Sequence, residues 1–224
     1  MSYRVLSFNI LSGINEPRYP LVDRIDKIIQ YIKSVSADII CLQEVAKTVI
    51  ASLETSFVTD GYFVSRTYTG REFVMILTKF PHTSTTLVID SNKAFVIAEY
   101  NDIQIVGIHL TSDCAKDSIA KRQMQLQLIL NVIKADRAII VGDVNMSGKI
   151  EELVDYTDCA IASTSVEPTF NTDSNEIAKI CKKDEAGVLA RFDRIYLKGF
   201  ICMSYEVDTK IVLSDHYPIL AQIL

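Results

Sequence analysis

One of the three histidines in this chain stands where an imidazole could be tuned for chemistry on a phosphate. His216 directly follows Asp215 at the end of an apolar, strand-like run, and a second acid, Asp193, lies in another such run, R-F-D-R-I-Y-L. A neighbouring carboxylate orients an imidazole and favours its protonated form, which can donate to a phosphate oxygen. We therefore predict that Asp193 orients His216 and that both belong to a catalytic site.

Other strand-like runs also end in polar side chains, namely Asn9, Gln43 with Glu44, His109, and Asp143 with Asn145. Sites gather at strand ends because the rigid scaffold gives way to loops there. Taken singly, each residue has an ordinary structural explanation: Asn9 could cap a turn, and His109 could be a hydrogen-bonded core histidine. Asp193 could pair with a neighbouring arginine. However, if separate strands bring all of these side chains to one edge of the fold, a shared ligand is the better explanation.

Together these side chains match metal-assisted hydrolysis of a phosphate ester. Glu44, assisted by Asn9 or Asp215, offers the oxygen ligands that Mg²⁺ prefers, and Mn²⁺ is an alternative. Asp143 is the candidate that orients or deprotonates the attacking water. Developing negative charge on the phosphate requires hydrogen-bond donors. The predicted donors are His109, Asn145 and His216.

The hydrophobic pattern predicts strands and helices that would hold these residues. Apolar runs predict strands at residues 3–10, 38–42 and 138–145, several short strands between 61 and 109, and two near the C-terminus. Apolar residues at helical spacing predict helices at residues 21–35, 46–53, 116–133 and 151–154. Residues 163–187 are expected to form a long polar loop.

Two local patterns are more specific. Asn101 and Asp102 between two apolar runs predict a tight hairpin turn. In the helix at 116–133, the predicted inward-facing residues are Ile119, Met124, Leu128 and Ile129.

Each half of the chain runs strand, helix, strand, with polar residues at the strand ends. This order predicts an α/β fold with two packed sheets and outer helices, a four-layer α-β-β-α sandwich. Because no linker or low-complexity segment divides the sequence, we expect a single catalytic domain over residues 1–224.

Composition limits the classes of partner. The net charge of −5, without a block of Lys or Arg, predicts weak non-specific grip on a nucleic acid, so a local site must hold any phosphate. Five cysteines without a C-x-x-C pair indicate free thiols in a reducing, intracellular compartment. No signal-like N-terminus and no apolar run of membrane-spanning length is present, so no membrane partner is expected. We expect a monomer.

Six ordered segments resemble the endonuclease/exonuclease/phosphatase superfamily, which has the DNase I-like fold. They are S-F-N (7–9), L-Q-E-V (42–45), H-L-T-S (109–112), G-D-V-N (142–145), R-F-D-R-I (191–195) and S-D-H-Y-P (214–218). The resemblance implies a four-layer sandwich, dependence on Mg²⁺, and hydrolysis of phosphodiesters or phosphomonoesters without a covalent intermediate.

Within that superfamily, R-F-D-R-I-Y, P-T-F-N-T-D-S-N (168–175) and D-I-I-C-L-Q-E-V are most similar to the tyrosyl-DNA phosphodiesterase 2 family. This resemblance implies hydrolysis of 5′-phosphotyrosyl–DNA or protein–RNA linkages of the DNA-repair type, with a nucleic acid 5′ end, expected to be single-stranded, as partner. It also implies that Ser112 contacts phosphate and that Phe170 lines the groove for nucleic acid. Arg122 and Arg71 are further substrate-binding candidates by the same resemblance.

The chain departs from this family at two places, and the departures keep alternatives open. Ser147 stands where the family usually has an arginine, and Arg71 where it has an aromatic residue. The same hydrolase chemistry on a small or cyclic nucleotide, an RNA end or a phosphoinositide is therefore a second hypothesis. A non-catalytic binding module that keeps the fold is a third, which the complete set of candidate catalytic residues disfavours.

Overall fold

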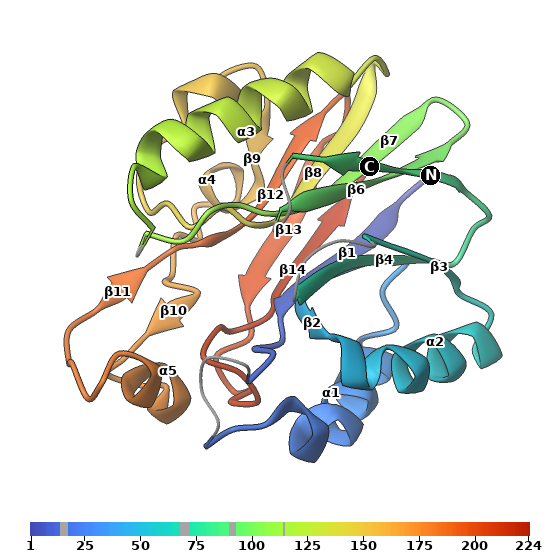
Figure 1. The fold of residues 1–224 in the computed structure, drawn as a ribbon. Helices are drawn as coiled ribbons and strands as arrows, with labels where there is room; N and C mark the ends of the chain where they lie inside the picture. The colour runs from blue at the N-terminus through green and yellow to red at the C-terminus, as the bar shows by residue number, and fades with distance from the viewer. Residues whose placement is uncertain (14–17, 68–71, 90–92, 114) are drawn as a thin grey trace.

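The computed structural model describes residues 1–13, 18–67, 72–89, 93–113 and 115–224. Two six-stranded sheets in these residues pack face to face, with helices on both outer surfaces (Figure 1). The first sheet has the order β13-β14-β1-β2-β4-β3 and the second β5-β6-β7-β8-β12-β9. The four-layer sandwich predicted from the sequence is therefore confirmed.

The strands of the first sheet are β1 (Tyr3–Asn9), β2 (Ile39–Ala46), β3 (Phe63–Arg66), β4 (Glu72–Thr78), β13 (Cys202–Val207) and β14 (Ile219–Ile223). Those of the second sheet are β5 (Thr83–Val88), β6 (Ala94–Tyr100), β7 (Ile103–His109), β8 (Arg137–Asp143), β9 (Thr157–Asp158) and β12 (Asp193–Lys198). A separate hairpin pairs β10 (Phe170–Asn171) with β11 (Leu189–Ala190).

The helices are α1 (Leu21–Val35), α2 (Ile50–Thr59), α3 (Ser118–Val132), α4 (Cys159–Ala162) and α5 (Glu176–Cys181), with 3-10 turns η1 (Lys47–Val49) and η2 (Glu151–Leu153). Helices α1 and α2 cover the first sheet and α3 covers the second (Figure 1). No helix in the described ranges is both long and apolar enough to cross a membrane.

Three apolar layers hold the sandwich together. One lies between α1, α2 and the first sheet, one between the two sheets, and one between the second sheet and α3. Helix α1 shows how the sequence produces this packing, because Ile25, Ile28 and Ile32 recur on one face and are buried. Burial of each such side chain contributes about 1.5–3 kcal/mol.

Several predicted boundaries need correction. The strand predicted at 38–42 continues to Ala46, because a β-bulge between Leu42 and Val45 keeps it paired with β4. The helix predicted at 46–53 begins later, as η1 and then α2, and extends to Thr59. The 163–187 segment is not an unstructured loop, since it contains β10 and α5. The hairpin turn at Asn101–Asp102 is present between β6 and β7.

The inward face of α3 was predicted correctly at Ile129 and wrongly at Ile119 and Met124. Ile119 and Met124 are 66% and 50% exposed, whereas Arg122, Gln125, Leu126 and Ile129 are buried. Two polar residues occupy inward positions because both have partners there. Gln125 exchanges hydrogen bonds with Thr111, and Arg122 donates to the Thr111 carbonyl. Hydrophobic periodicity therefore identifies Ile129 but not the two polar residues on the buried face of this helix.

Candidate active site

Strand register places three of the predicted catalytic residues side by side. In the second sheet, Asp143 lies opposite His109 of β7 and opposite Asp193 of β12. Residues that are directly opposite each other in neighbouring strands project from the same face of a sheet. The ends of β7 and β8 and the start of β12 therefore deliver an imidazole and two carboxylates to one edge of the sandwich.

Gly142 permits this close arrangement. Its φ is +141°, and a Cβ at this position would lie 2.0 Å from the carbonyl oxygen of Ile108. Only glycine avoids that collision, so the glycine of G-D-V-N is required by backbone approach between β7 and β8. The acid that follows it is consequently held next to His109.

The first sheet contributes Asn9 and Glu44. Asn9 ends β1, and Glu44 sits in the β2 bulge with a φ of +55°. The side-chain amide of Asn9 donates to Glu44 Oε1 at 3.0 Å and to Asp143 Oδ2 at 3.1 Å. Asn9 Oδ1 accepts from the Leu11 amide at 3.1 Å. Asn9 thus links the carboxylates of the two sheets.

His216 reaches the same place from the loop before β14, and the β10 segment holds that loop. His216 forms a β-bridge with Phe170, and the Tyr217 amide donates to the Thr169 carbonyl at 2.7 Å. Asn175 caps α5 with its side-chain oxygen and donates through its amide nitrogen to the carbonyls of Ser214 and Asp215. The position of His216 therefore depends on the 168–175 segment.

His216 and Asp193 form the predicted pair. His216 Nδ1 lies 2.7 Å from Asp193 Oδ2, which also accepts from Thr169 Oγ1 at 2.6 Å. His216 Nε2 is then directed towards Asp143, with 3.9 Å to Oδ2. His109 Nε2 lies 3.7 Å from the same oxygen. Asp143 therefore faces two imidazoles.

Burial and charge shift the pKa values of these groups in different directions. Burial would lower the pKa of His216, but the carboxylates of Asp193 and Asp143 outweigh it and raise that pKa well above its usual range. Burial, followed by Lys93 and His216, lowers the pKa of His109, so this imidazole is neutral. Burial raises the pKa of Asp143 to about 6, a value suited to a general base near neutral pH.

Three carboxylates, those of Glu44, Glu72 and Asp215, lie close together in the same site. Burial, then Glu72 and Asp215, raise the pKa of Glu44 to about 8. Within the described residues, no Lys or Arg forms an ion pair with any of these three acids. A divalent cation with oxygen ligands would relieve this repulsion. The donor set therefore fits the metal that the resemblance implies.

The site opens into a cavity of about 620 Å³, which is large enough for a nucleotide-sized ligand. Its lining includes Glu44, Glu72, His109, Ser112, Asp143, Asn145, Asp215 and His216, together with Lys93, Lys182, Lys183, Phe170 and Phe192. The acids lie beside three lysines and two histidines, an arrangement that can hold an anionic substrate and a cation together.

A predicted catalytic donor, Asn145, and a predicted substrate contact, Ser112, also line this cavity. Asn145 is fixed by its own backbone amide, which donates to Asp143 Oδ1 at 2.8 Å, and by its side chain, which donates to the Leu110 carbonyl at 3.1 Å. Ser112 is exposed at the cavity wall. Both therefore lie where a substrate phosphate could be reached.

Two other residues predicted to bind substrate, Arg122 and Phe170, do not offer an exposed contact in this cavity. Arg122 is buried under the loop after β7, where it bonds the Thr111 carbonyl and Asp113, and it does not line the cavity. Phe170 is 3% exposed and packs against His216 at 5.3 Å between ring centroids, so it supports the histidine more than it offers a stacking surface. Arg71 lies outside the described residues.

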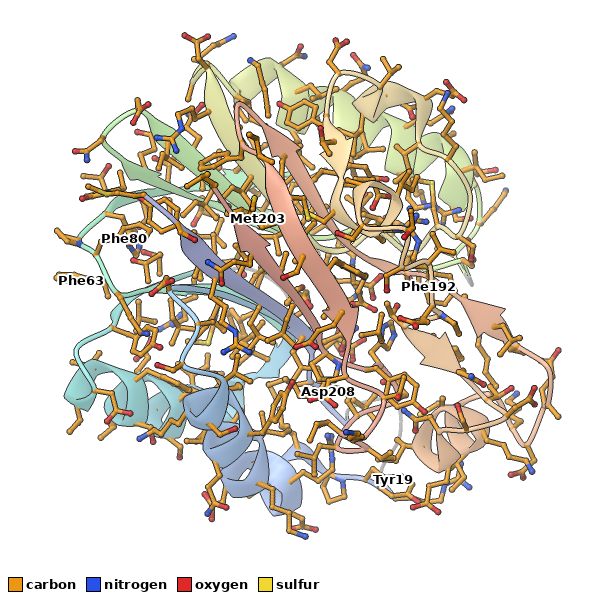
Figure 2. All side chains as sticks on the ribbon, turned by 180° about the vertical axis from the view of Figure 1, so that it is seen from behind. Tyr19, Phe63, Phe80, Phe192, Met203 and Asp208 are labelled. Atoms are coloured by element: carbon orange, nitrogen blue, oxygen red, sulfur yellow. The ribbon has the colours of Figure 1, made fainter. Side chains whose placement is uncertain are left out.

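Sequence reasoning missed several contributors. Phe192 is more exposed than Phe170 and lies where the sandwich meets the β10–β11 hairpin (Figure 2). Glu72 was overlooked because it begins β4 without any motif around it. Thr169 and Asn175 lie in a segment that was read as a loop. The pattern N-E-I-A at 175–178 is a helix-capping signal that could have revealed Asn175.

Comparison with protein-family profiles identifies the family of this chain. The sequence profile of the Endonuclease/Exonuclease/phosphatase family matches residues 6–216, and the chain belongs to this family. The resemblance predicted from the six motifs is therefore confirmed. Enzymes of this family are generally metal-dependent, and this chain has the acidic and histidine cluster that such chemistry uses. No curated protein matches the sequence.

Solved structures with a similar fold include TDP2 proteins, where TDP2 stands for tyrosyl-DNA phosphodiesterase 2. A truncated Caenorhabditis elegans TDP2 is 20% identical with a TM-score of 0.75, covering 100% of this chain and 98% of that one. D. rerio TDP2 complexed with a single-strand DNA product is 18% identical with a TM-score of 0.74, covering 100% and 99%. An endonuclease/exonuclease/phosphatase from Bacteroides vulgatus is 17% identical with a TM-score of 0.77, covering 100% and 99%. At these identities the similarity shows the fold alone.

Proposed function

We propose that this protein is a metal-dependent phosphodiesterase that hydrolyses a phosphodiester at a nucleic acid 5′ end, with a 5′-phosphotyrosyl–DNA or protein–RNA linkage as substrate and Mg²⁺ as cofactor. The observation that carries the proposal is the convergence of Glu44, Asp143, His109 and the His216–Asp193 pair on one cavity. This set combines a cation site, a base and phosphate donors.

Asp143 is the group that we assign to the attacking water. Asn9 and the Asn145 amide fix its two oxygens, so the carboxylate is held in one orientation. A pKa of about 6 leaves it ionised at neutral pH and still able to accept a proton. Because water attacks directly in this scheme, no covalent intermediate on the protein is required.

His216 is the principal donor to the phosphate. The Asp193 carboxylate fixes its Nδ1 and favours the imidazolium, which leaves Nε2 as a charged donor towards the cavity. Neutral His109 and Asn145 add uncharged donors to the same phosphate oxygens. Glu44 and Asp215 would hold the cation, which would polarise the phosphate and stabilise the leaving oxygen.

Support for a nucleic acid substrate comes from the cavity wall and from one neighbour. Lys182 and Lys183 follow α5 at the cavity rim and can contact a backbone phosphate, while Phe192 offers a ring to a base. D. rerio TDP2 binds single-strand DNA product in a similar fold. We further propose that the chain acts as a monomeric, single catalytic domain in a reducing intracellular compartment, in line with free thiols at Cys41, Cys159 and Cys202.

The alternative is the same chemistry on a smaller phosphodiester, such as a cyclic nucleotide. The specific observation in its favour is that Phe170 of β10 and Cys181 of α5 line the cavity, whose volume of about 620 Å³ suits a ligand of nucleotide size. Ser147 also lies apart from this cavity, so it does not supply the contact that an arginine would make there.

The deciding experiment measures 5′-phosphate release from a 5′-tyrosyl oligonucleotide with Mg²⁺ and with EDTA, beside Glu44→Ala. Metal-dependent release that is lost in Glu44→Ala is the expected result. Metal-dependent cleavage of bis-p-nitrophenyl phosphate without release from the oligonucleotide would favour the smaller substrate. No metal-dependent hydrolysis of either compound would refute the proposal.

A further inference from the structure

Glu72, the first residue of β4, is an acid whose position in the active site calls for an explanation. Its carboxylate lies in the cavity with Glu44, and ligand atoms of Glu44, Glu72 and His109 are all within 4.8 Å of one another. Two ligands of one Mg²⁺-sized ion, each about 2.0–2.1 Å from it, are at most about 4.2 Å apart. Small side-chain movements would therefore allow all three groups to contact a single ion.

Ser12 connects the two glutamates. Its hydroxyl donates to Glu72 Oε1 at 2.5 Å, and its backbone amide donates to Glu44 Oε2 at 3.3 Å. No hydrogen bond joins Glu44 to Glu72 in the described part of the chain, so they do not form a proton-sharing carboxyl pair. Ser12 instead holds two separate carboxylates at a fixed spacing, as an outer contact orients metal ligands.

Charge balance points in the same direction. Glu44, Glu72 and Asp215 face one another without an ion pair to Lys or Arg among the residues that the structure describes.

We propose that Glu72 is an additional carboxylate ligand of the divalent cation that Glu44 and Asp215 hold, with Ser12 as the outer contact that orients Glu44 and Glu72. The inference rests on the metal dependence in the proposed function. Glu72 thereby adds to the affinity of the site.

The test is Mn²⁺ binding by the full chain, followed through the electron paramagnetic resonance signal of free Mn²⁺, without substrate. Glu72→Gln keeps an oxygen acceptor for Ser12 and removes only the charge. Glu185→Gln is the matched control, because Glu185 is an exposed acid at the rim of the same cavity. Glu44→Gln reports whether the site itself exists.

We expect Glu72→Gln to weaken Mn²⁺ binding at least about 10-fold, the lower end of the loss seen when even an outer contact is removed. Glu185→Gln should bind Mn²⁺ like the wild type. Without metal, the melting temperature of Glu72→Gln should equal or exceed that of the wild type because a repulsion is removed. Its melting temperature should rise less on adding Mn²⁺.

The outcomes separate the two proposals. If Glu44→Gln loses Mn²⁺ binding while Glu72→Gln binds within twofold of the wild type, Glu72 is not a ligand and the proposed function stands. If the wild type itself binds no Mn²⁺ or Mg²⁺, both the assignment of Glu72 and the metal dependence in the proposed function are overturned.

Discussion

Asp143 lies at the centre of the candidate active site, because elements of both sheets contact its carboxylate. Asn9 binds one oxygen from the first sheet, the Asn145 amide binds the other, and His109 and His216 face it from either side. A side chain fixed in this way loses little entropy when it engages a water molecule. The orientation and proton affinity of the Asp143 carboxylate are therefore set by its neighbours.

Asp143→Asn should lower kcat about 10²–10⁴-fold, since the amide fills the same space but cannot accept the proton. Turnover of the 5′-tyrosyl oligonucleotide is the measurement, with the melting temperature as the check on folding. The matched control is Asp155→Asn, an exposed acid that does not line the cavity. Near-normal kcat in Asp143→Asn would show that another group handles the water.

The pH profile should report the same residue. Activity requires ionised Asp143 and protonated His216, so kcat/KM should rise through about pH 6 and fall again at alkaline pH as His216 loses its proton. Glu44, whose pKa burial raises to about 8, must be deprotonated to bind metal, so metal and proton compete. At low Mg²⁺ the acid limb should therefore move to higher pH. Profiles that coincide at low and saturating Mg²⁺ would contradict this competition.

Two aromatic rings should behave differently towards single-stranded DNA. Phe192 is half-buried at the cavity, whereas Phe170 is 3% exposed and packs on His216. Phe192→Ala should raise KM by a factor that corresponds to about 1–3 kcal/mol, the value of one stacked base. Phe170→Ala should instead lower kcat, because it loosens His216. Steady-state kinetics distinguish the two, and an unchanged KM in Phe192→Ala would favour a small substrate.

At the scale of elements, α5 shows how a short helix can control a distant catalytic residue. Asn175 caps α5 and also donates to the carbonyls of Ser214 and Asp215, directly before His216. Loss of the Asn175 side chain would remove the helix cap and the bonds to this loop together. The 168–175 segment therefore acts as a clamp on the loop that carries His216.

Asn175→Ala should destabilise the protein by about 0.5–2 kcal/mol, the usual cost of a lost N-cap, and should also lower kcat. The control is Asn171→Ala, since the Asn171 side chain accepts hydrogen bonds from the Asp173 and Ser174 amides of its own turn. Denaturant unfolding and kcat are measured for both variants. Loss of stability without any loss of kcat in Asn175→Ala would show that the clamp does not position His216.

At the scale of the whole molecule, the net charge of −5 makes binding of nucleic acid depend on a few local cations. Lys93, Lys182 and Lys183 line the cavity. If each meets one phosphate of a single strand, the slope of log affinity against log salt should be about −2, at about −0.7 per contact. Fluorescence anisotropy of a single-stranded oligonucleotide with Asp143→Asn measures this slope. A slope steeper than about −4 would indicate a phosphate-binding surface beyond the cavity.

Local sequence determined much of this protein by itself. Apolar periodicity predicted α1 with its observed bounds, because its isoleucines repeat on one face, and buried runs ending in polar residues predicted the strands that carry Asn9, His109 and Asp143. The six motifs in their order predicted the family and, through it, the four-layer fold. These features are local or fixed by chain order, so no knowledge of packing is needed to find them.

Tertiary structure alone decided the rest. Arg122 and Gln125 face inward on α3 because Thr111 meets them there, and Phe170 is buried because His216 and Phe192 cover it. Glu72 enters the site because β4 pairs with β2 beside the bulge at Glu44. Each outcome depends on a partner far away in the sequence, and such partners become visible only when the two sheets have been packed together.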